Sequence, residues 1–165
     1  MSTCTNSDKD WVEVSEKCEK SAAFDVNQIV SFITHPSAGG ISLFIGTTRD
    51  NFQEKEVVQL EYEGYRPMAI SEAHKICDNI RRQWPSVVKI AIHHKLGIVP
   101  VEEASVIIGV SSPHRKAAID ACAFAIEAVK AKMPIWKLEH YKGDTRRWKE
   151  NVEWNGKRVM LPEEN

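Results

Sequence analysis

The chain has 165 residues, 42% of them hydrophobic and 27% charged, with a formal net charge of −1. This composition is typical of a single folded domain with a sizeable core, and the near-zero charge excludes a protein that attracts nucleic acid or anionic membrane over its whole surface. With no signal-peptide pattern and no apolar run of membrane-spanning length, a cytosolic protein without membrane attachment is expected.

The N-terminal part is expected to form a strand and then a short helix. Residues 1–10 are polar and small, and they predict a disordered tail. The alternation of apolar and polar residues over 11–15 predicts an edge strand. Asp25 and Gln28 have the spacing of a capping box, which predicts a helix over residues 26–34.

The middle of the chain contains several stretches with strand character and one amphipathic helix. Apolar residues repeat every three or four positions from about Pro67 to Trp84, which predicts a helix with one solvated face. Gly46 lies inside an apolar stretch and predicts a β-bulge or a close approach of another backbone. A turn-like connection is expected over residues 96–100. Strands are predicted over residues 41–48, 57–65, 87–94, 104–110 and 135–141.

The predicted order of elements is β-α-β-β-α-β-β-α-β. Because consecutive strands favour antiparallel pairing, this order predicts an α+β fold with helices packed on a mostly antiparallel sheet. No repeat and no linker divides the chain, so one domain is expected over residues 11–148, followed by a polar C-terminal tail over residues 149–165.

The stretch of residues 111–137 predicts an apolar helix with cationic side chains at each end. Ser112 is expected to cap this helix, and Pro113 to occupy its first position. His114 and Arg115 follow at once. The free N–H groups and the dipole at a helix start already favour anions, so this end predicts a phosphate-binding site.

Further cationic residues flank the same helix and its neighbouring strands. Lys130 ends the apolar body of the helix, Lys137 follows in the next strand, and Arg49 stands at the end of the strand over residues 41–48. In the simplest interpretation, Lys130 complements the helix dipole and Arg115 is solvated.

The distance between the two helix ends favours a second interpretation. Arg115 and Lys130 are separated by about 22 Å of helix, so one small ligand cannot contact both within one chain. Either two separate sites exist, or a homodimer brings the start of one helix to the end of the other. We favour the homodimer, because it forms one dense cationic pocket from two sparse ones.

No metal or cofactor site is predicted. His93 and His94 are adjacent on a predicted strand, so they point to opposite faces and are not expected to share a metal. The four cysteines show no C-x-x-C spacing, which indicates a reducing compartment and no zinc site. These cysteines are Cys4, Cys18, Cys77 and Cys122, of which the last two are expected in the core.

Six segments, in order and at fitting spacing, resemble the catalytic (large) subunit of molybdopterin synthase over about residues 11–148. The resemblance implies an α/β hammerhead fold. It also implies a homodimer of large subunits with a small ubiquitin-like sulfur-carrier subunit bound at each end, which together form a heterotetramer. The segments are FIGTTRD (44–50), LEYEGYRPMA (60–69), RQWP (82–85), HKLGIVP (94–100), SSPHR (111–115) and VKAKMPIWK (129–137).

The resemblance implies an enzyme that transfers sulfur. Cyclic pyranopterin monophosphate (precursor Z) would receive two sulfurs from the Gly-Gly thiocarboxylate of the small subunit and become molybdopterin, a step of molybdenum cofactor biosynthesis. A phosphate and a thiocarboxylate must meet there, so a cationic pocket makes chemical sense. The family's catalytic lysines match Lys130 and Lys137, and its substrate-binding positions match Arg49, His114, Arg115, Lys130, Lys137, Leu138 and Glu139.

The resemblance also places an arginine of the partner subunit in the C-terminal region, where Arg146, Arg147 and Arg158 are the candidates. Two functions of other classes stay open from the residues themselves. One is a non-catalytic scaffold that binds a ubiquitin-like tail, and the other is a sensor of a phosphate ligand. A sensor needs only the cations at the helix start, whereas a transferase also needs the two lysines.

Overall fold

The structure is a computed structural model, and it describes residues 4–16, 24–143 and 146–149. These residues form three helices and a nine-stranded sheet, which confirms the predicted α+β class. The helices are α1 (Val26–Ile33), α2 (Arg66–Gln83) and α3 (Arg115–Lys132). The strands are β1 (Cys4–Asn6), β2 (Asp10–Glu16), β3 (Gly40–Thr47), β4 (Asn51–Phe52), β5 (Lys55–Gly64), β6 (Lys89–Pro100), β7 (Ala104–Ser112), β8 (Ile135–Tyr141) and β9 (Arg146–Lys149).

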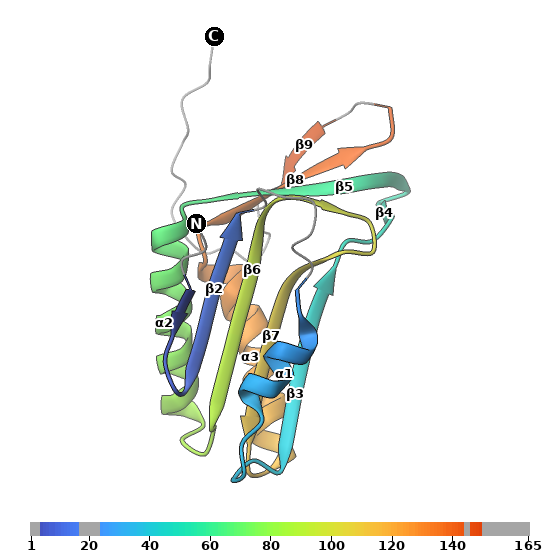
Figure 1. The fold of residues 1–165 in the computed structure, drawn as a ribbon. Helices are drawn as coiled ribbons and strands as arrows, with labels where there is room; N and C mark the ends of the chain where they lie inside the picture. Colours follow the sequence, from blue (N-terminus) through green and yellow to red (C-terminus); the bar gives the residue numbers. More distant parts are fainter. Residues whose placement is uncertain (1–3, 17–23, 144–145, 150–165) are drawn as a thin grey trace.

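The strands form a long part and a crossing part, the hammerhead-like arrangement expected (Figure 1). In the long part, neighbouring strands follow the order β1, β2, β6, β7 and β3. The crossing part contains β4, β5, β8 and β9 and lies over one end of the long strands. Pairing is antiparallel except between β2 and β6, so the prediction of a mostly antiparallel sheet is confirmed.

Strand β6 joins the two parts of the sheet. It pairs with β2 as far as Leu96, and from Gly97 onward it pairs with β5. Gly97 has φ 85°, a left-handed conformation that glycine adopts at little cost, and this lets the strand turn from one set of neighbours to the other. The turn expected over residues 96–100 is therefore wrong, because pairing with the distant β5 keeps this segment extended.

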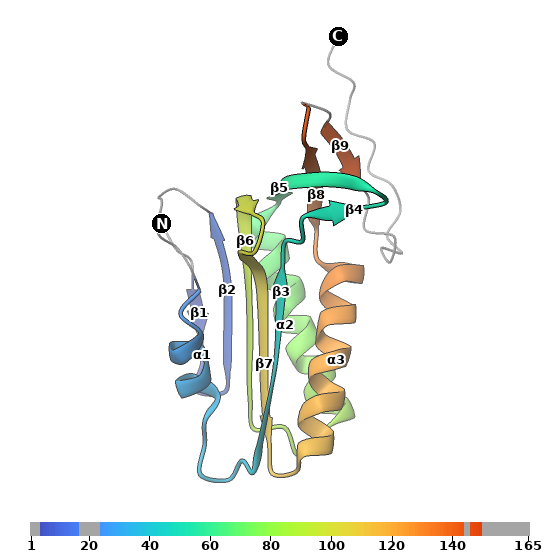
Figure 2. The same ribbon diagram turned by 90° about the vertical axis from the view of Figure 1, so that its right-hand side faces the viewer.

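The helices cover both faces of the long part (Figure 2). Helices α2 and α3 lie on one face over the main core, whose fully buried members include Ile76, Ile90 and Ile108. Helix α1 lies on the other face over a smaller core around Ile33 and Ile107. Burial of these apolar side chains is the main force that holds the layers together.

Several local predictions are confirmed. Asp25 caps α1, where its carboxylate accepts a hydrogen bond from the backbone N–H of Gln28 at 3.0 Å. The register of β3 against β7 shifts directly after Gly46, as a bulge requires. Cys77 and Cys122 are buried as core residues.

Other local predictions are wrong because pairing between strands determines the structure at those residues. Ser112 does not cap α3, because it is buried as the last residue of β7, where it pairs with Gly40. Pro113 consequently precedes the helix, and His114 occupies the cap position without a side-chain hydrogen bond. The strand over residues 11–15 is not an edge, since β2 lies between β1 and β6.

The predicted tails are only partly described. Residues 4–10 of the predicted disordered tail form β1 and the turn into β2, which corrects that prediction for them. In the C-terminal tail, Lys149 is the last residue of β9, and residues 150–165 lie outside the described residues, as do residues 1–3. No helix in the described part of the chain is long and apolar enough to cross a membrane.

Candidate active site

A cavity of about 500 Å³ lies where the crossing strands meet the end of α3. Its walls come from the ends of β3 and α3, from the starts of β7 and β8, from β4 and β5, and from His94 of β6. The polar or charged side chains that line it are Thr47, Arg49, Asn51, Tyr62, His94, Ser105, Lys130, Lys137 and Glu139.

Alternation along β8 places Lys137 and Glu139 on the cavity face. The ammonium of Lys137 is 3.4 Å from Oε1 of Glu139, and the hydroxyl of Tyr141 donates a hydrogen bond to Oε2 of the same carboxylate. Leu138 falls between them and points to the opposite face, where it is buried. Of the expected pair Leu138 and Glu139, therefore, only Glu139 lines this cavity.

Lys130 reaches the cavity from the last turn of α3. Three apolar side chains of the same chain segment line the wall beside it, namely Ile126, Val129 and Met133. A lysine stem can lie along such an apolar surface while its ammonium remains near water.

Arg49 lines the cavity from the segment that follows β3. Its guanidinium lies 5.5 Å from the centroid of the Phe52 ring, and this cation–π contact orients an otherwise exposed side chain. Three cationic groups from three different segments therefore converge on one cavity: Arg49, Lys130 and Lys137.

Five polar residues of the cavity were not predicted as site residues, namely Thr47, Asn51, Tyr62, His94 and Ser105, and the last three lie close together. The Tyr62 hydroxyl donates to Oγ of Ser105 at 3.1 Å, and the His94 ring packs edge-on against Tyr62 with their centroids 5.1 Å apart. Burial raises the pKa of Tyr62, and the nearby Glu139 adds to this rise. Burial lowers the pKa of His94 to about 4. Only the strand alternation of these residues could have indicated that they face inward.

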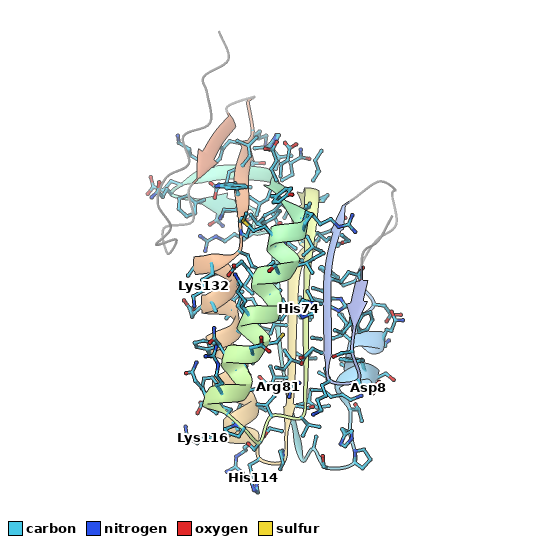
Figure 3. The ribbon with its side chains drawn as sticks, turned by 90° about the vertical axis from the view of Figure 1, so that its left-hand side faces the viewer. Asp8, His74, Arg81, His114, Lys116 and Lys132 are labelled. Atoms are coloured by element: carbon cyan, nitrogen blue, oxygen red, sulfur yellow. The ribbon has the colours of Figure 1, made fainter. Side chains whose placement is uncertain are left out.

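His114 and Arg115 do not line the cavity. They are exposed at the start of α3, and Figure 3 shows His114 and Lys132 at opposite ends of this helix. The start of β3 lies beside them, since a Cβ on Gly40 would come within 3.1 Å of the Cα of Arg115. Of the arginine candidates in the C-terminal region, Arg146 and Arg147 lie on β9, and Arg158 lies outside the described residues.

The described residues contain no group of three or more histidine, cysteine, aspartate or glutamate side chains that could hold a metal ion. His93 and His94 lie on opposite faces of β6, as predicted, with His93 against Trp11 and His94 against Tyr62. The side chains in the cavity are instead suited to binding anions and to proton transfer.

Comparison with known proteins identifies relatives over most of the chain. The model of the family described as MoaE protein matches residues 19–132. The molybdopterin synthase catalytic subunit of Taeniopygia guttata is 49% identical over 145 residues, which cover 88% of this chain and 90% of that protein. The molybdopterin synthase catalytic subunit of Homo sapiens is 49% identical over 150 residues, which cover 88% and 79% of the two chains.

Solved structures with the same fold include relatives and more distant proteins. Molybdopterin synthase from Staphylococcus aureus superimposes with a TM-score of 0.74 at 34% identity, covering 78% of this chain and 92% of that chain. A complex of subunits 1 and 2 of molybdopterin-converting factor from Helicobacter pylori contains a chain with a TM-score of 0.66 at 18% identity, covering 87% and 92%. The second similarity shows a shared fold alone.

Proposed function

The chain belongs to the MoaE protein family, and we propose that the cavity between α3 and β8 is the active site at which it transfers sulfur to form molybdopterin. Its relatives are catalytic subunits of molybdopterin synthase, and its role is enzymatic, in molybdenum cofactor biosynthesis. The chain provides the catalytic surface, and a small thiocarboxylated carrier subunit provides the sulfur.

The convergence of cations is the observation that carries this proposal. Arg49, Lys130 and Lys137 line one cavity with a single carboxylate, Glu139, although the whole chain has a net charge of −1. Such a local positive field attracts anions and stabilises them at close range. Both reactants are anionic, because precursor Z carries a phosphate and the carrier ends in a thiocarboxylate.

The two lysines reach the cavity from different elements, Lys137 from β8 and Lys130 from the last turn of α3, and we assign them different tasks. Lys137 is held beside Glu139, so its ammonium has a fixed position from which it can orient a reactant. Lys130 stands at the apolar end of α3 and is the better candidate for proton transfer. Sulfur transfer forms a carbon–sulfur bond on the pterin as a carbon–oxygen bond there breaks, and water then cleaves the acyl–sulfur bond and leaves a carboxylate on the carrier. Both steps develop charge on oxygen that an ammonium group can stabilise or protonate.

The site is completed by a second copy of the chain. His114 and Arg115 are suited to a phosphate but lie about 22 Å along α3 from Lys130. Strand β3 spans a similar length, about 23 Å, from Gly40 beside Arg115 to Thr47 in the cavity wall. Two β3 strands paired antiparallel about a two-fold axis would therefore bring Arg115 of one copy to the cavity of the other.

Strand β3 has the surface expected for such pairing. Among the described strands it pairs only with β7, so its outer edge is open. Ile41, Leu43 and Ile45 are 41%, 37% and 42% exposed along it, and the strand carries no charged residue. An open apolar edge is a common site of association between chains.

Reconstitution of the reaction tests the proposal. The chain is mixed with thiocarboxylated carrier and precursor Z, and molybdopterin is expected as the product. Binding of the carrier without product would favour the scaffold, and binding of precursor Z without carrier binding or product would favour the phosphate sensor. Either outcome would overturn the proposed transferase.

A complementation experiment tests the shared pocket. At low concentrations of precursor Z, Arg115→Ala and Lys130→Ala chains are each expected to have little activity, but a hybrid dimer has one pocket with both residues intact. Random reassociation would then restore about a quarter of wild-type activity, because half of the dimers are hybrids and each hybrid has one intact site out of two. No recovery in a mixture shown to contain hybrids would contradict a pocket shared between copies.

A further inference from the structure

Two adjacent histidines of β6 lie in different surroundings. His93 is 3% exposed and packs against Trp11 and Phe24 on the α1 face of the sheet. His94 is 7% exposed and lines the cavity on the other face. The roles proposed for Arg49, Lys130 and Lys137 in sulfur transfer do not involve His94.

The hydrogen bond of the His94 ring fixes which nitrogen carries the proton. Nδ1 lies 2.8 Å from the backbone oxygen of Lys95. A carbonyl oxygen only accepts, so Nδ1 carries the hydrogen and donates it, and in the neutral ring Nε2 keeps its lone pair. No described residue is hydrogen-bonded to Nε2.

The surroundings hold the ring in place and keep it neutral. Tyr62 packs edge-on against it and is fixed by its hydrogen bond to Ser105, which in turn donates to the backbone oxygen of Gly46 at 3.4 Å. Burial lowers the pKa of His94 to about 4, so the ring is neutral near pH 7. Nε2 is therefore a positioned acceptor at neutral pH.

The cations of the cavity offer no acceptor for a hydrogen bond, and the acceptors in its wall are Glu139 and neutral side chains, among them Thr47, Asn51 and His94. The three cations only donate hydrogen bonds, and they suit phosphate and thiocarboxylate oxygens. The carboxylate of Glu139 is already engaged by Lys137 and Tyr141. A reduced pterin also presents N–H and O–H groups, and a donor that loses water without gaining an acceptor costs about 1–3 kcal/mol.

We propose that His94 is a substrate-binding residue of this site, whose Nε2 accepts a hydrogen bond from an N–H or O–H group of the pterin substrate. This inference rests on the proposed function and deepens it. This role predicts that Nε2 of His94 contributes to the affinity for precursor Z. It should not contribute to docking of the carrier, because a thiocarboxylate needs hydrogen-bond donors.

Two substitutions separate the two nitrogens of the ring. His94→Asn keeps an amide N–H near the place of Nδ1 and removes the acceptor from the cavity. His94→Gln can place its amide oxygen where Nε2 lies in the wild type, but it loses the hydrogen bond from Nδ1 to the backbone oxygen of Lys95. Calorimetry should show precursor Z binding within about 3-fold of wild type for the glutamine variant and about 10-fold weaker for the asparagine variant. The reverse order, or wild-type affinity for both, would overturn the inference.

A matched control and a measurement without substitution complete the test. His93→Asn changes the neighbouring buried histidine on the other face, and it should lower the melting temperature without changing the affinity for precursor Z. In the wild-type chain, the ¹⁵N chemical shift of His94 Nε2 should move when precursor Z saturates the site. An unchanged shift would overturn the inference even if the variants fail to fold.

The outcome for wild type distinguishes the two proposals. If the wild-type chain with its carrier neither binds precursor Z nor forms molybdopterin, the proposed function fails and the role of His94 fails with it. If the wild-type chain is active and the asparagine variant binds precursor Z normally, only the role of His94 fails.

Discussion

Lys137 and Glu139 lie two positions apart on β8, and the ammonium of Lys137 is 3.4 Å from Oε1 of Glu139. The two side chains differ in burial, at 38% and 3% exposed. The second oxygen of the carboxylate accepts a hydrogen bond from the hydroxyl of Tyr141, which is itself buried. The Glu139 carboxylate thus contacts both the buried Tyr141 hydroxyl and the Lys137 ammonium in the cavity wall.

Removal of this carboxylate should affect both stability and activity. Glu139→Ala leaves the buried Tyr141 hydroxyl without its acceptor, so the free energy of unfolding should fall by about 1–3 kcal/mol. Glu139→Gln keeps an oxygen acceptor and should cost less. Both should slow sulfur transfer, because Lys137 loses the charge that positions it. Denaturant unfolding and turnover measure the two effects, and an alanine variant with wild-type stability would contradict the first.

Lys130→Ala should nearly abolish sulfur transfer while the fold survives. If Lys130 only complemented the helix dipole, its loss would cost about 0.3–1 kcal/mol of stability and leave turnover unchanged. As a group that positions or protonates a reactant, its loss should lower turnover by ~100-fold or more. Lys130→Arg keeps the charge but does not release a proton, so it should restore carrier docking and not catalysis. Single-turnover assays and carrier titration separate these outcomes.

Arg115→Ala should weaken binding of precursor Z more than binding of the carrier. A charge-assisted contact to phosphate at a helix start is worth roughly 1.5–3 kcal/mol, or about 10- to 100-fold in affinity. Calorimetry with each ligand in turn measures the difference. Lys116→Ala is a suitable control on the same helix turn, because Lys116 already pairs with Asp120 at 2.8 Å. An equal loss of affinity for both ligands would argue against a phosphate contact.

Leu43→Glu should convert the homodimer to a monomer. Leu43 lies near the middle of β3, so antiparallel pairing about a two-fold axis would bring the two introduced carboxylates together. Light scattering measures the molar mass, and thermal unfolding checks that the monomer is folded. Met68→Glu introduces the same charge at an exposed apolar residue of α2 and should leave the dimer intact. A dimeric Leu43→Glu chain would exclude the proposed β3 interface.

Acid should destabilise the fold through the two buried histidines. Burial lowers the pKa of both His93 and His94 from 6.5 to about 4. Between these values the unfolded chain binds protons that the folded chain does not. Stability is therefore retained above about pH 6.5 and falls as the pH drops toward 4, by up to about 3 kcal/mol for each histidine.

Urea unfolding at several pH values between 4 and 8 measures this dependence. The His93→Gln and His94→Gln double variant should show a flatter profile than wild type over the same range, because it lacks both groups that titrate. A wild-type stability that does not change between pH 6.5 and 4.5 would contradict neutral, buried histidines.

Local periodicity determined much of this protein from the sequence alone. Alternation placed His93 and His94 on opposite faces, and the spacing of Asp25 and Gln28 predicted the cap of α1. The apolar stretch before Lys130 predicted a helix that ends close to this residue, as α3 does, although one face of α3, including Ile119, is exposed. Each of these depends on neighbours within a few positions, which is the range over which the periods of helices and strands act.

Tertiary structure alone decided where the distant segments meet. Pairing with β5 kept residues 97–100 extended, and pairing with β3 drew Ser112 out of the helix and into β7. Tyr62 and Ser105 are 43 positions apart, yet they share a hydrogen bond beside His94. No local pattern specifies such contacts, because they follow from how complete strands and helices pack to bury their apolar faces.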